Sequence, residues 1–529
     1  MKTKLQISTG RKNIPKHRES LPALPDLLVS GGDKRIAINP ETGYNHYYCQ
    51  PAPDPLLRTY GSTTASSISF RSYQKLEQMH DRLLHRNNHT PLHQIYAEEM
   101  DRIRRALLDL CGFKEKSDVE LIFAASGTDL HYIAALLDRQ MGKHPPLVIM
   151  VSPTESGTGI PDALSGKSLS FGKNTDSFSS SGTSSSQSLK PDVLFVQLRR
   201  EDGNLRPSLE IDSEFELLAK KGALQNRRVL IVMTDISKSG CLSPTPSCAL
   251  ALLEKFPEKV TILVDACQFR IAPETLKAYL GAGCMVALTG SKFLTGPAFS
   301  GVLFLPPQLS FRYRSFPLPQ ELKSVSAISH WPVDWPGVSL LPPIPNFGLL
   351  FRWEAALEEL RAFRTLHGPS VMNFMQKFRN AILERLDGDP TFRSLPVTAM
   401  DRSPLSRSTD WDSIQTIFPF QLFHARTDHK PLSMAQTVQI YQQLQYLPFQ
   451  SDRTLAVNEQ KGAAKTRFQF GQPVSWGSDH TDPPGALRLS LSSRLIVESL
   501  QDESSEAGKV IERALEALDN VSAYVHDFK

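Results

Sequence analysis

The sequence has 529 residues, of which 40% are hydrophobic and 22% are charged, and its formal net charge is +4. This length exceeds that of one simple hydrophobic core, so two lobes are expected. The mild charge gives no case for binding nucleic acid, and no apolar run approaches the roughly 18 residues of a membrane-spanning helix.

The first 90 residues are predicted to form an N-terminal extension. Six Lys and Arg residues precede Glu19, the first acid. A flexible basic tail is the preferred interpretation, and organelle import by a transit peptide is the alternative. The six cysteines of the chain form no CxxC pair, which favours reduced thiols and a cytoplasmic location. His85, His89 and His93 are spaced by four, but Pro91 interrupts a helix there, so no metal site is predicted.

Residues 91–348 are predicted to form a large α/β domain. Ile95 to Leu110 has the period of an amphipathic helix. Seven short apolar runs follow, at 119–124, 146–151, 193–198, 228–234, 260–264, 285–288 and 301–305. Because helical patterns alternate with these runs, we expect a seven-stranded, mostly parallel sheet. The Ser-rich stretch 165–190 cannot bury much apolar area and is interpreted as a surface insertion.

A candidate anion site follows the first of these strands. Ser126, Gly127 and Thr128 form a turn of small residues, and 129–140 has the apolar period of a helix. A helix N-terminus offers free backbone N–H groups and a favourable dipole, and the two hydroxyls add donors. An ordinary Ser/Thr helix cap is the plainer alternative.

A carboxylate and an amine follow two later strands. Asp265 ends the run 260–264, and Gln268 stands three residues on. Thr289, Gly290, Ser291 and Lys292 follow the run 285–288. The ends of parallel strands meet at the edge where open α/β sheets bind ligands.

Together these groups suit pyridoxal 5'-phosphate (PLP). This cofactor needs an amine for its Schiff base, an anion beside its ring nitrogen and a phosphate cradle. Lys292, Asp265 and the turn at 126–128 can supply them in that order.

A smaller α+β domain is predicted over 349–529, after an irregular segment rich in Pro and aromatic residues at 311–346. Helices are expected at 371–386 and 510–518, and strands at 413–424, 467–471 and 487–491, with a turn at 471–473. Arg488 and Ser490 share one face of the last strand. A guanidinium can bind a carboxylate bidentately, as an amino-acid substrate requires; an exposed strand arginine is the alternative.

The motifs resemble those of fold-type I PLP enzymes, in particular the class V aminotransferase group with its cysteine desulfurases and kynureninase-like enzymes. Ser126-Gly127-Thr128 is similar to their phosphate turn and Asp265-x-x-Gln268 to their DxxQ. Thr289-Gly290-Ser291-Lys292 resembles their lysine loop, and Arg488-x-Ser490 their late RxS strand. The resemblance spans roughly residues 90 to 520.

The resemblance implies roles for single residues. Asp265 would pair the ring nitrogen, Gln268 would contact the ring oxygen, and Arg488 would hold the substrate carboxylate. Ser156 and Ser237 occupy loops that touch the cofactor in relatives. An N-terminal segment often lies over the active site in relatives, which makes Tyr44 and Asn45 candidates for substrate contact; ordinary surface turn residues are the preferred alternative. Thr289 and Ser291 complete the expected cofactor set, and a homodimer is expected.

Three positions depart from the family pattern. Ser156 stands where desulfurases carry a ring-stacking His, and serine is a poor base at neutral pH. No cysteine follows Cys284, so the persulfide-forming nucleophile of those enzymes is missing. Ile344 replaces the Thr that reaches the other subunit's phosphate.

The predicted function is therefore that of a PLP-dependent enzyme acting on a small amino acid. Lys292 would form the Schiff base and then abstract the Cα proton, followed by elimination or group transfer. An aminotransferase and a catalytically silent scaffold of the same fold remain the alternatives. Neither a nucleic acid nor a membrane is expected as a partner.

Overall fold

The structure is a computed structural model. It describes residues 20–61, 66–114, 118–167, 190–406, 410–424, 430–445, 466–476, 483–501 and 506–527. Most of the Ser-rich stretch 165–190 and of the basic N-terminus lies outside the described residues.

The first sheet contains the seven predicted strands, in the order β2-β9-β8-β7-β5-β3-β4. They are β2 (Glu120–Ala124), β3 (Leu147–Val151), β4 (Asp192–Val196), β5 (Val229–Asp235), β7 (Val260–Asp265), β8 (Met285–Thr289) and β9 (Gly301–Leu305). Strand β9 is antiparallel to both its neighbours, and the other pairs along this order are parallel. A two-residue strand, β6 (Leu242–Ser243), pairs with β5. The predicted α/β class with a mostly parallel sheet is confirmed.

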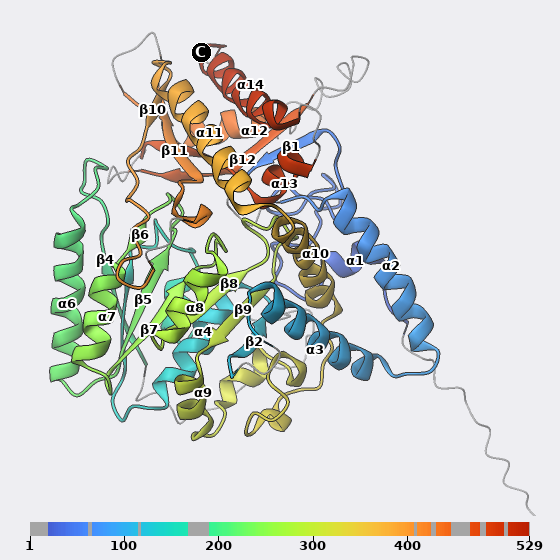
Figure 1. The fold of residues 1–529 in the computed structure, drawn as a ribbon, viewed down its shortest axis with the longest axis vertical. Helices are drawn as coiled ribbons and strands as arrows, with labels where there is room; N and C mark the ends of the chain where they lie inside the picture. Colours follow the sequence, from blue (N-terminus) through green and yellow to red (C-terminus); the bar gives the residue numbers. More distant parts are fainter. Residues whose placement is uncertain are drawn as a thin grey trace, which may run out of the picture.

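Helices cover both faces of this sheet (Figure 1). One face carries α3 (Leu92–Leu110), α6 (Ser208–Leu224), α7 (Pro246–Lys255), α8 (Pro273–Gly281) and α10 (Phe347–Arg364), and the other α4 (Gly127–Arg139), α5 (Ile160–Leu164) and α9 (Pro307–Arg314). Along β3, Ile149 and Val151 join the first core, whereas Val148 and Met150 join the second. Two-sided burial explains why the strands are continuous apolar runs rather than alternating ones.

The segment 311–346 packs on the second of these cores. It contains the 3-10 helices Gln320–Ser324, Ile328–His330 and Val338–Leu340. Trp331 and Trp335 are both buried there, with ring centroids 5.2 Å apart. The expectation of a packed irregular connection is confirmed.

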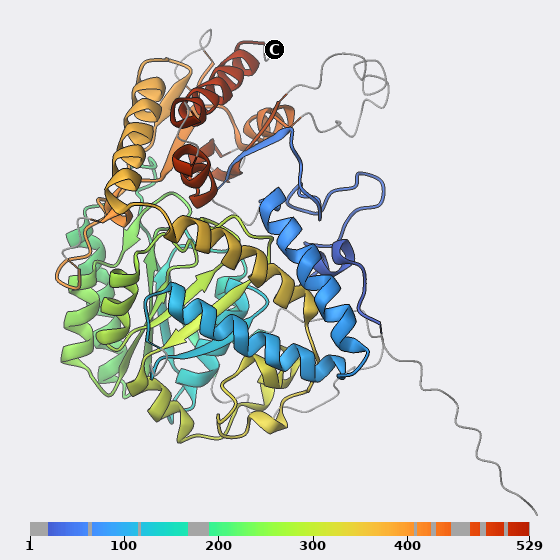
Figure 2. The same cartoon turned by 45° about the vertical axis from the view of Figure 1, so that its right-hand side comes forward.

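The second sheet has five strands in the order β1-β12-β13-β11-β10. They are β1 (Leu57–Tyr60), β10 (Phe392–Ser394), β11 (Ile417–Leu422), β12 (Arg467–Ser475) and β13 (Gly485–Ser490), accompanied by α11 (Gly368–Asp387), α12 (Met434–Gln443), α13 (Ser493–Gln501) and α14 (Glu506–Asp527). Strand β1 is parallel to β12, and the remaining pairs are antiparallel. This is the predicted smaller α+β part, which lies above the first sheet in Figure 2.

The N-terminal residues contribute to both parts. Strand β1 forms an edge of the second sheet, while α1 (Leu24–Leu28) and α2 (Phe70–Asn87) pack against α10. The division of the chain at residues 90 and 348 stays a prediction, and these contacts show that β1, α1 and α2 pack with both parts of the structure.

The turn predicted at 471–473 is wrong. These residues lie inside β12, whose register against β13 shifts between Gly471 and Val474. Pro473 has no N–H to donate to a ladder, and a bulge accommodates that loss without ending the strand.

Candidate active site

A cavity of about 290 Å³ lies at the edge where the parallel strands of the first sheet end. This volume is close to the lower limit for small-molecule sites, roughly 300 Å³. The following predicted residues line it: Ser126, Gly127, Thr128, Ser156, Ser237, Asp265, Gln268, Thr289, Ser291, Lys292 and Arg488. Residues that are up to 362 positions apart in the chain thus meet around one space, in a position that open α/β sheets use for ligands.

Two predicted residues do not line this cavity. The Tyr44 hydroxyl accepts a hydrogen bond from Arg467 at 3.1 Å. The Asn45 side chain accepts from the backbone N–H groups of Tyr47 and Cys49, at 2.9 and 3.0 Å. The Asn45 side chain therefore closes a local turn, and the residue that this turn presents to the cavity is Tyr47.

The anion turn forms at the N-terminus of α4. The Ser126 hydroxyl accepts from the backbone N–H of Asp129 at 3.2 Å and donates to the Asp129 carboxylate at 2.7 Å. The serine is thus a helix cap as well as a cavity residue, which leaves the first-turn N–H groups of Gly127 and Thr128 and the Thr128 hydroxyl for an anion. A Cβ on Gly127 would lie 2.9 Å from Cys267 Sγ, so only glycine fits this close approach.

Asp265 is a buried carboxylate with a histidine beside it. His131 on α4 has Nε2 3.5 Å from Asp265 Oδ2 and Nδ1 2.7 Å from the carbonyl oxygen of Gly127. Burial alone would raise the pKa of Asp265, but His131, Lys292 and the N–H of Cys267 hold that pKa below its usual range. The carboxylate therefore stays charged.

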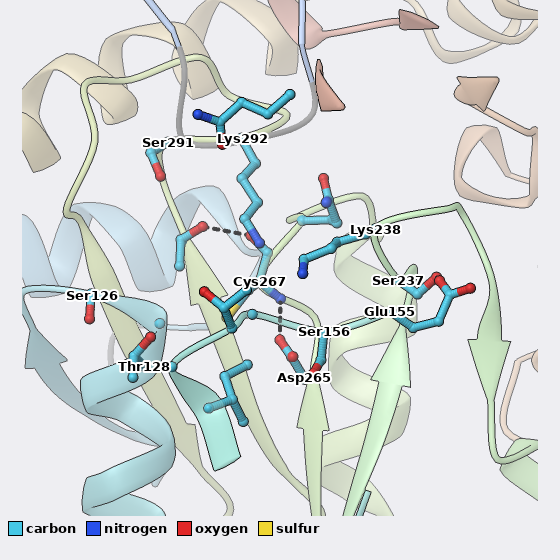
Figure 3. Close-up of a pocket in the computed structure, with 18 of the residues that line it drawn as sticks. Ser126, Thr128, Glu155, Ser156, Ser237, Lys238, Asp265, Cys267, Ser291 and Lys292 are labelled. Atoms are coloured by element: carbon cyan, nitrogen blue, oxygen red, sulfur yellow. Dashed lines mark hydrogen bonds between the residues drawn. The ribbon is translucent and has the colours of Figure 1, made fainter. Parts of the chain in front are cut away.

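The lysine loop is held by close backbone packing. Gly290 and Gly296 would each bring a Cβ within 2.8 Å of the Ala356 side chain on α10. The Thr289 hydroxyl donates to the carbonyl of Cys267 at 2.6 Å and so joins the end of β8 to the loop after β7. These contacts fix the backbone on both sides of Lys292, whose half-buried side chain points into the cavity in Figure 3.

A buried network stands beside the cavity. The Glu155 carboxylate accepts from Arg199 Nε at 2.9 Å and from the hydroxyls of Ser237 and Ser239, at 2.7 and 2.6 Å. Burial raises the pKa of Glu155, but Arg199 and the two hydroxyls lower it below its usual range. The Ser237 hydroxyl is thus committed to Glu155, whereas the buried Ser156 hydroxyl has no partner among the described residues.

Arg488 projects from β13 of the second sheet. Its terminal nitrogens donate to the backbone carbonyls of Lys238, at 3.0 Å, and of Gln472. A guanidinium has five N–H groups, so donors remain. Arg488 makes no ion pair within the described parts of the chain, and burial lowers its pKa to about 10. A buried cation of this kind lacks a counter-charge that a bound carboxylate could provide.

Several lining residues were missed from the sequence. They include Arg35, Tyr47, Glu155, Lys238, Phe299 and Gln472, together with His131 behind Asp265. Most come from loops or from elements that fold onto the edge from elsewhere in the chain. The sequence gives a signal at the loop after β5, where Lys238 is the charged neighbour of the predicted Ser237.

Comparisons with known proteins found relatives by structure alone. The chain is similar to a NifS-like protein from Rickettsia africae, with 13% identity, 88% of this chain and 99% of that chain covered, and a TM-score of 0.46. It is also similar to a cysteine desulfurase from Thermococcus onnurineus, with 13% identity, coverage of 87% and 94%, and a TM-score of 0.49. A third similar structure is the TDC of Oryza sativa, solved with PLP and tryptamine. It is 9% identical, 89% of this chain and 84% of that chain are covered, and the TM-score is 0.48.

No family model matches the chain, and no curated protein matches it. At these identities and TM-scores the neighbours say nothing about substrate or reaction. Among the helices that the structure describes, none is long and apolar enough to cross a membrane. The described residues also contain no group of three or more side chains that could hold a metal ion.

Proposed function

We propose that this protein is a PLP-dependent enzyme acting on an amino acid. One observation carries the proposal: Lys292, Asp265 and the turn at 126–128 line a single cavity at the edge of the first sheet. An amine, a charged carboxylate and an anion-binding helix terminus are the groups that PLP requires.

The residues present fit the cofactor. Lys292 would hold its aldehyde carbon covalently, Asp265 its ring nitrogen, and the N–H groups of Gly127 and Thr128 its phosphate. Asp265 is already charged in the protein, and the Ser156 hydroxyl is a buried polar atom without a partner in the part of the chain that the structure describes. A bound cofactor could satisfy that hydroxyl.

When bound, PLP withdraws electrons from the Cα atom of an amino acid joined to it. The residues of the chain do the remaining work. Asp265 keeps a proton on the ring nitrogen, Arg488 holds the α-carboxylate, and Lys292 moves the proton at Cα. The walls that Phe299 and Tyr47 add to the cavity help to exclude water.

Elimination is the proposed reaction after proton removal, and transamination is the second candidate. A protein-bound persulfide is disfavoured because the last cysteine is Cys284, ahead of the lysine loop. Cys267 lines the cavity, but burial and the charge of Asp265 raise the pKa of its thiol well above the usual range. A direct lyase needs no such nucleophile. A homodimer in the cytoplasm remains part of the proposal.

The first test is spectroscopic. We expect the purified protein mixed with PLP to develop a visible absorbance band and, after borohydride reduction, to carry one reduced cofactor on the peptide containing Lys292. Lys292→Ala should abolish both signals, whereas Lys220→Ala, at an exposed position on α6, should leave them unchanged. A label on any other lysine, or no label at all, would refute the proposal and favour a silent scaffold.

The second test separates the two reactions. A single amino acid is added without a keto-acid acceptor, and products are counted per enzyme. A lyase releases keto acid and ammonia over many turnovers, whereas an aminotransferase stops after one equivalent of keto acid, with the amino group left on the cofactor. A single-equivalent burst would replace elimination with transamination.

A further inference from the structure

The cavity contains more positive charge than the proposed function uses. Four cations line it, Arg35, Lys238, Lys292 and Arg488. Two carboxylates line it as well, those of Glu155 and Asp265. Arg35 is bound to Asp33 at 2.9 Å, and Glu155 is bound to Arg199. Three cations, Lys238, Lys292 and Arg488, therefore remain against the single carboxylate of Asp265.

Lys238 is the cation without an assigned role. It follows Ser237 in the loop after β5 and is half-buried. Its Nζ donates to the carbonyl oxygen of Pro153 at 3.1 Å. An ammonium has three donors, and Lys238 is in no ion pair within the described residues. In Figure 3 its amine points toward the centre of the cavity, beside that of Lys292.

The position of Lys238 separates it from the phosphate turn. In the view of Figure 3, Lys292 lies between Lys238 and the turn with Ser126 and Thr128. The backbone carbonyl of Lys238 accepts a hydrogen bond from Arg488 at 3.0 Å, so the two cations belong to one wall of the cavity. Lys238 is therefore next to the substrate's proposed carboxylate site rather than next to the cofactor's phosphate.

We propose that Arg488 and Lys238 form a two-cation subsite that selects an amino acid with a negatively charged side chain. Arg488 holds the α-carboxylate, and Lys238 binds the second acidic group, a carboxylate or a chemically similar oxyanion. This assignment rests on the proposed function, because it takes an amino acid as the substrate. Two anions on one small molecule match buried Arg488 and half-buried Lys238, whereas a neutral side chain leaves Lys238 without a counter-charge.

The protonation of Lys238 agrees with this role. Burial, together with the charges of Arg488 and Lys292, lowers the pKa of Lys238 to about 8, although Glu155 acts in the opposite direction. The amine is therefore mainly charged at pH 7 and becomes neutral above pH 8. The preference for an acidic over a neutral substrate should fall as the pH rises through that value.

The test compares acids with their amides. The PLP-loaded protein is titrated with L-aspartate, L-asparagine, L-glutamate and L-glutamine, and binding is followed by the change in cofactor absorbance. The expected result is that one acid binds about ten- to hundredfold more tightly than its amide, the range of a charge-assisted hydrogen bond. In Lys238→Met this ratio should fall to about one while the affinity for the amide stays the same.

Two further variants make the result specific. Lys238→Arg should keep the acid preference, and Lys220→Met on α6 should behave as the wild type. Equal binding of acids and amides by the wild type would overturn the subsite. So would a Lys238→Met variant that loses PLP or loses acids and amides equally, because Lys238 would then support the cofactor or the fold.

The cofactor-free protein separates this inference from the proposed function. It is titrated calorimetrically with the same four amino acids. Acid preference without uptake of PLP would leave the subsite standing and refute the enzyme proposal. Uptake of PLP without acid preference would support the enzyme proposal and refute the subsite. If neither is observed, both proposals are refuted.

Discussion

At the scale of single residues, His131 belongs to the site through its contact with Asp265. Its Nε2 lies 3.5 Å from Asp265 Oδ2, behind the cavity. His131 lies one position from the apolar face of α4, so helical periodicity gives no sign of this contact, and Lys238 is recognised only by the residues that fold around it. The turn at 126–128 and the loop ending at Lys292 are local sequences whose backbone does part of the chemistry, so their pattern could be predicted.

Asp129 gives a prediction that depends on pH. Burial raises its pKa from 3.8 to about 6, although bonds from Ser126 and the charge of Arg35 act to lower it. The folded state therefore prefers the protonated form. The stability from this group is complete below about pH 4 and is lost as the pH rises through about 6.

Asp129→Asn should remove that loss. The variant is expected to be more stable than the wild type by about 1–3 kcal/mol at pH 7, and equally stable at pH 4. Its amide oxygen can still accept from Ser126, so the cap is preserved. Urea unfolding at the two pH values measures the difference; the same change at both would show that the effect is not titration.

At the scale of elements, the strands of the first sheet were predictable because burial on both faces makes each one an uninterrupted apolar run. The predicted strand at 467–471 ends at the bulge of β12, because Gly and Pro are typical of hairpin turns and of bulges alike. The loops that carry Lys238 and Arg402 have no period at all. The first loop is held by hydrogen bonds from Ser237 and Ser239 to Glu155, and the second by the ion pair of Arg402 with Asp235, which a single sequence does not reveal.

Arg402 joins the segment after β10 to the end of β5. Its guanidinium donates twice to the Asp235 carboxylate, both at 2.8 Å, and the Tyr279 hydroxyl donates to the same carboxylate at 2.6 Å. Asp235 and Arg402 are 1% and 4% exposed. Removing one partner of such a pair leaves the other charge buried and uncompensated.

Arg402→Met is therefore expected to lower the free energy of unfolding by about 3–5 kcal/mol. The double variant Asp235→Asn, Arg402→Met should lose less than the sum of the two single variants, because neither charge is then left alone. Denaturant unfolding of the four proteins measures this coupling. Additive losses would mean that the two residues act independently.

At the scale of the whole molecule, the family resemblance implied that an N-terminal segment lies over the site, but not how that segment is attached. Arg35 and Tyr47 do line the cavity, yet β1 pairs with β12 across more than 400 residues. Two strands that pair in parallel across so many residues leave no local pattern in the sequence. The N-terminal segment packs closely on α10 at Gly348, where a Cβ would lie 2.2 Å from the carbonyl oxygen of Ser30.

Arg352 is the residue that holds this segment to the cavity wall. It is fully buried on α10, and its guanidinium donates to the carbonyls of Phe299 at 2.8 Å and Gly31 at 3.2 Å, and also to those of Leu28 and Ser30. Phe299 lines the cavity, so one side chain connects the N-terminal segment, α10 and the site. Loss of these bonds would leave several buried carbonyls without partners.

Arg352→Met should therefore loosen the N-terminal segment before it unfolds the protein. We expect a loss of roughly 3 kcal/mol in unfolding free energy, from two or three unsatisfied carbonyls, together with faster proteolysis between residues 28 and 61 and weaker binding of PLP. Arg105→Met, at an exposed position on α3, is the matched control. If cleavage in that segment is no faster than in the control while stability falls, Arg352 supports only the core of α10. Faster cleavage with unchanged PLP binding would instead show that Arg35 and Tyr47 are dispensable walls, and that the cofactor is held entirely by the edge of the first sheet.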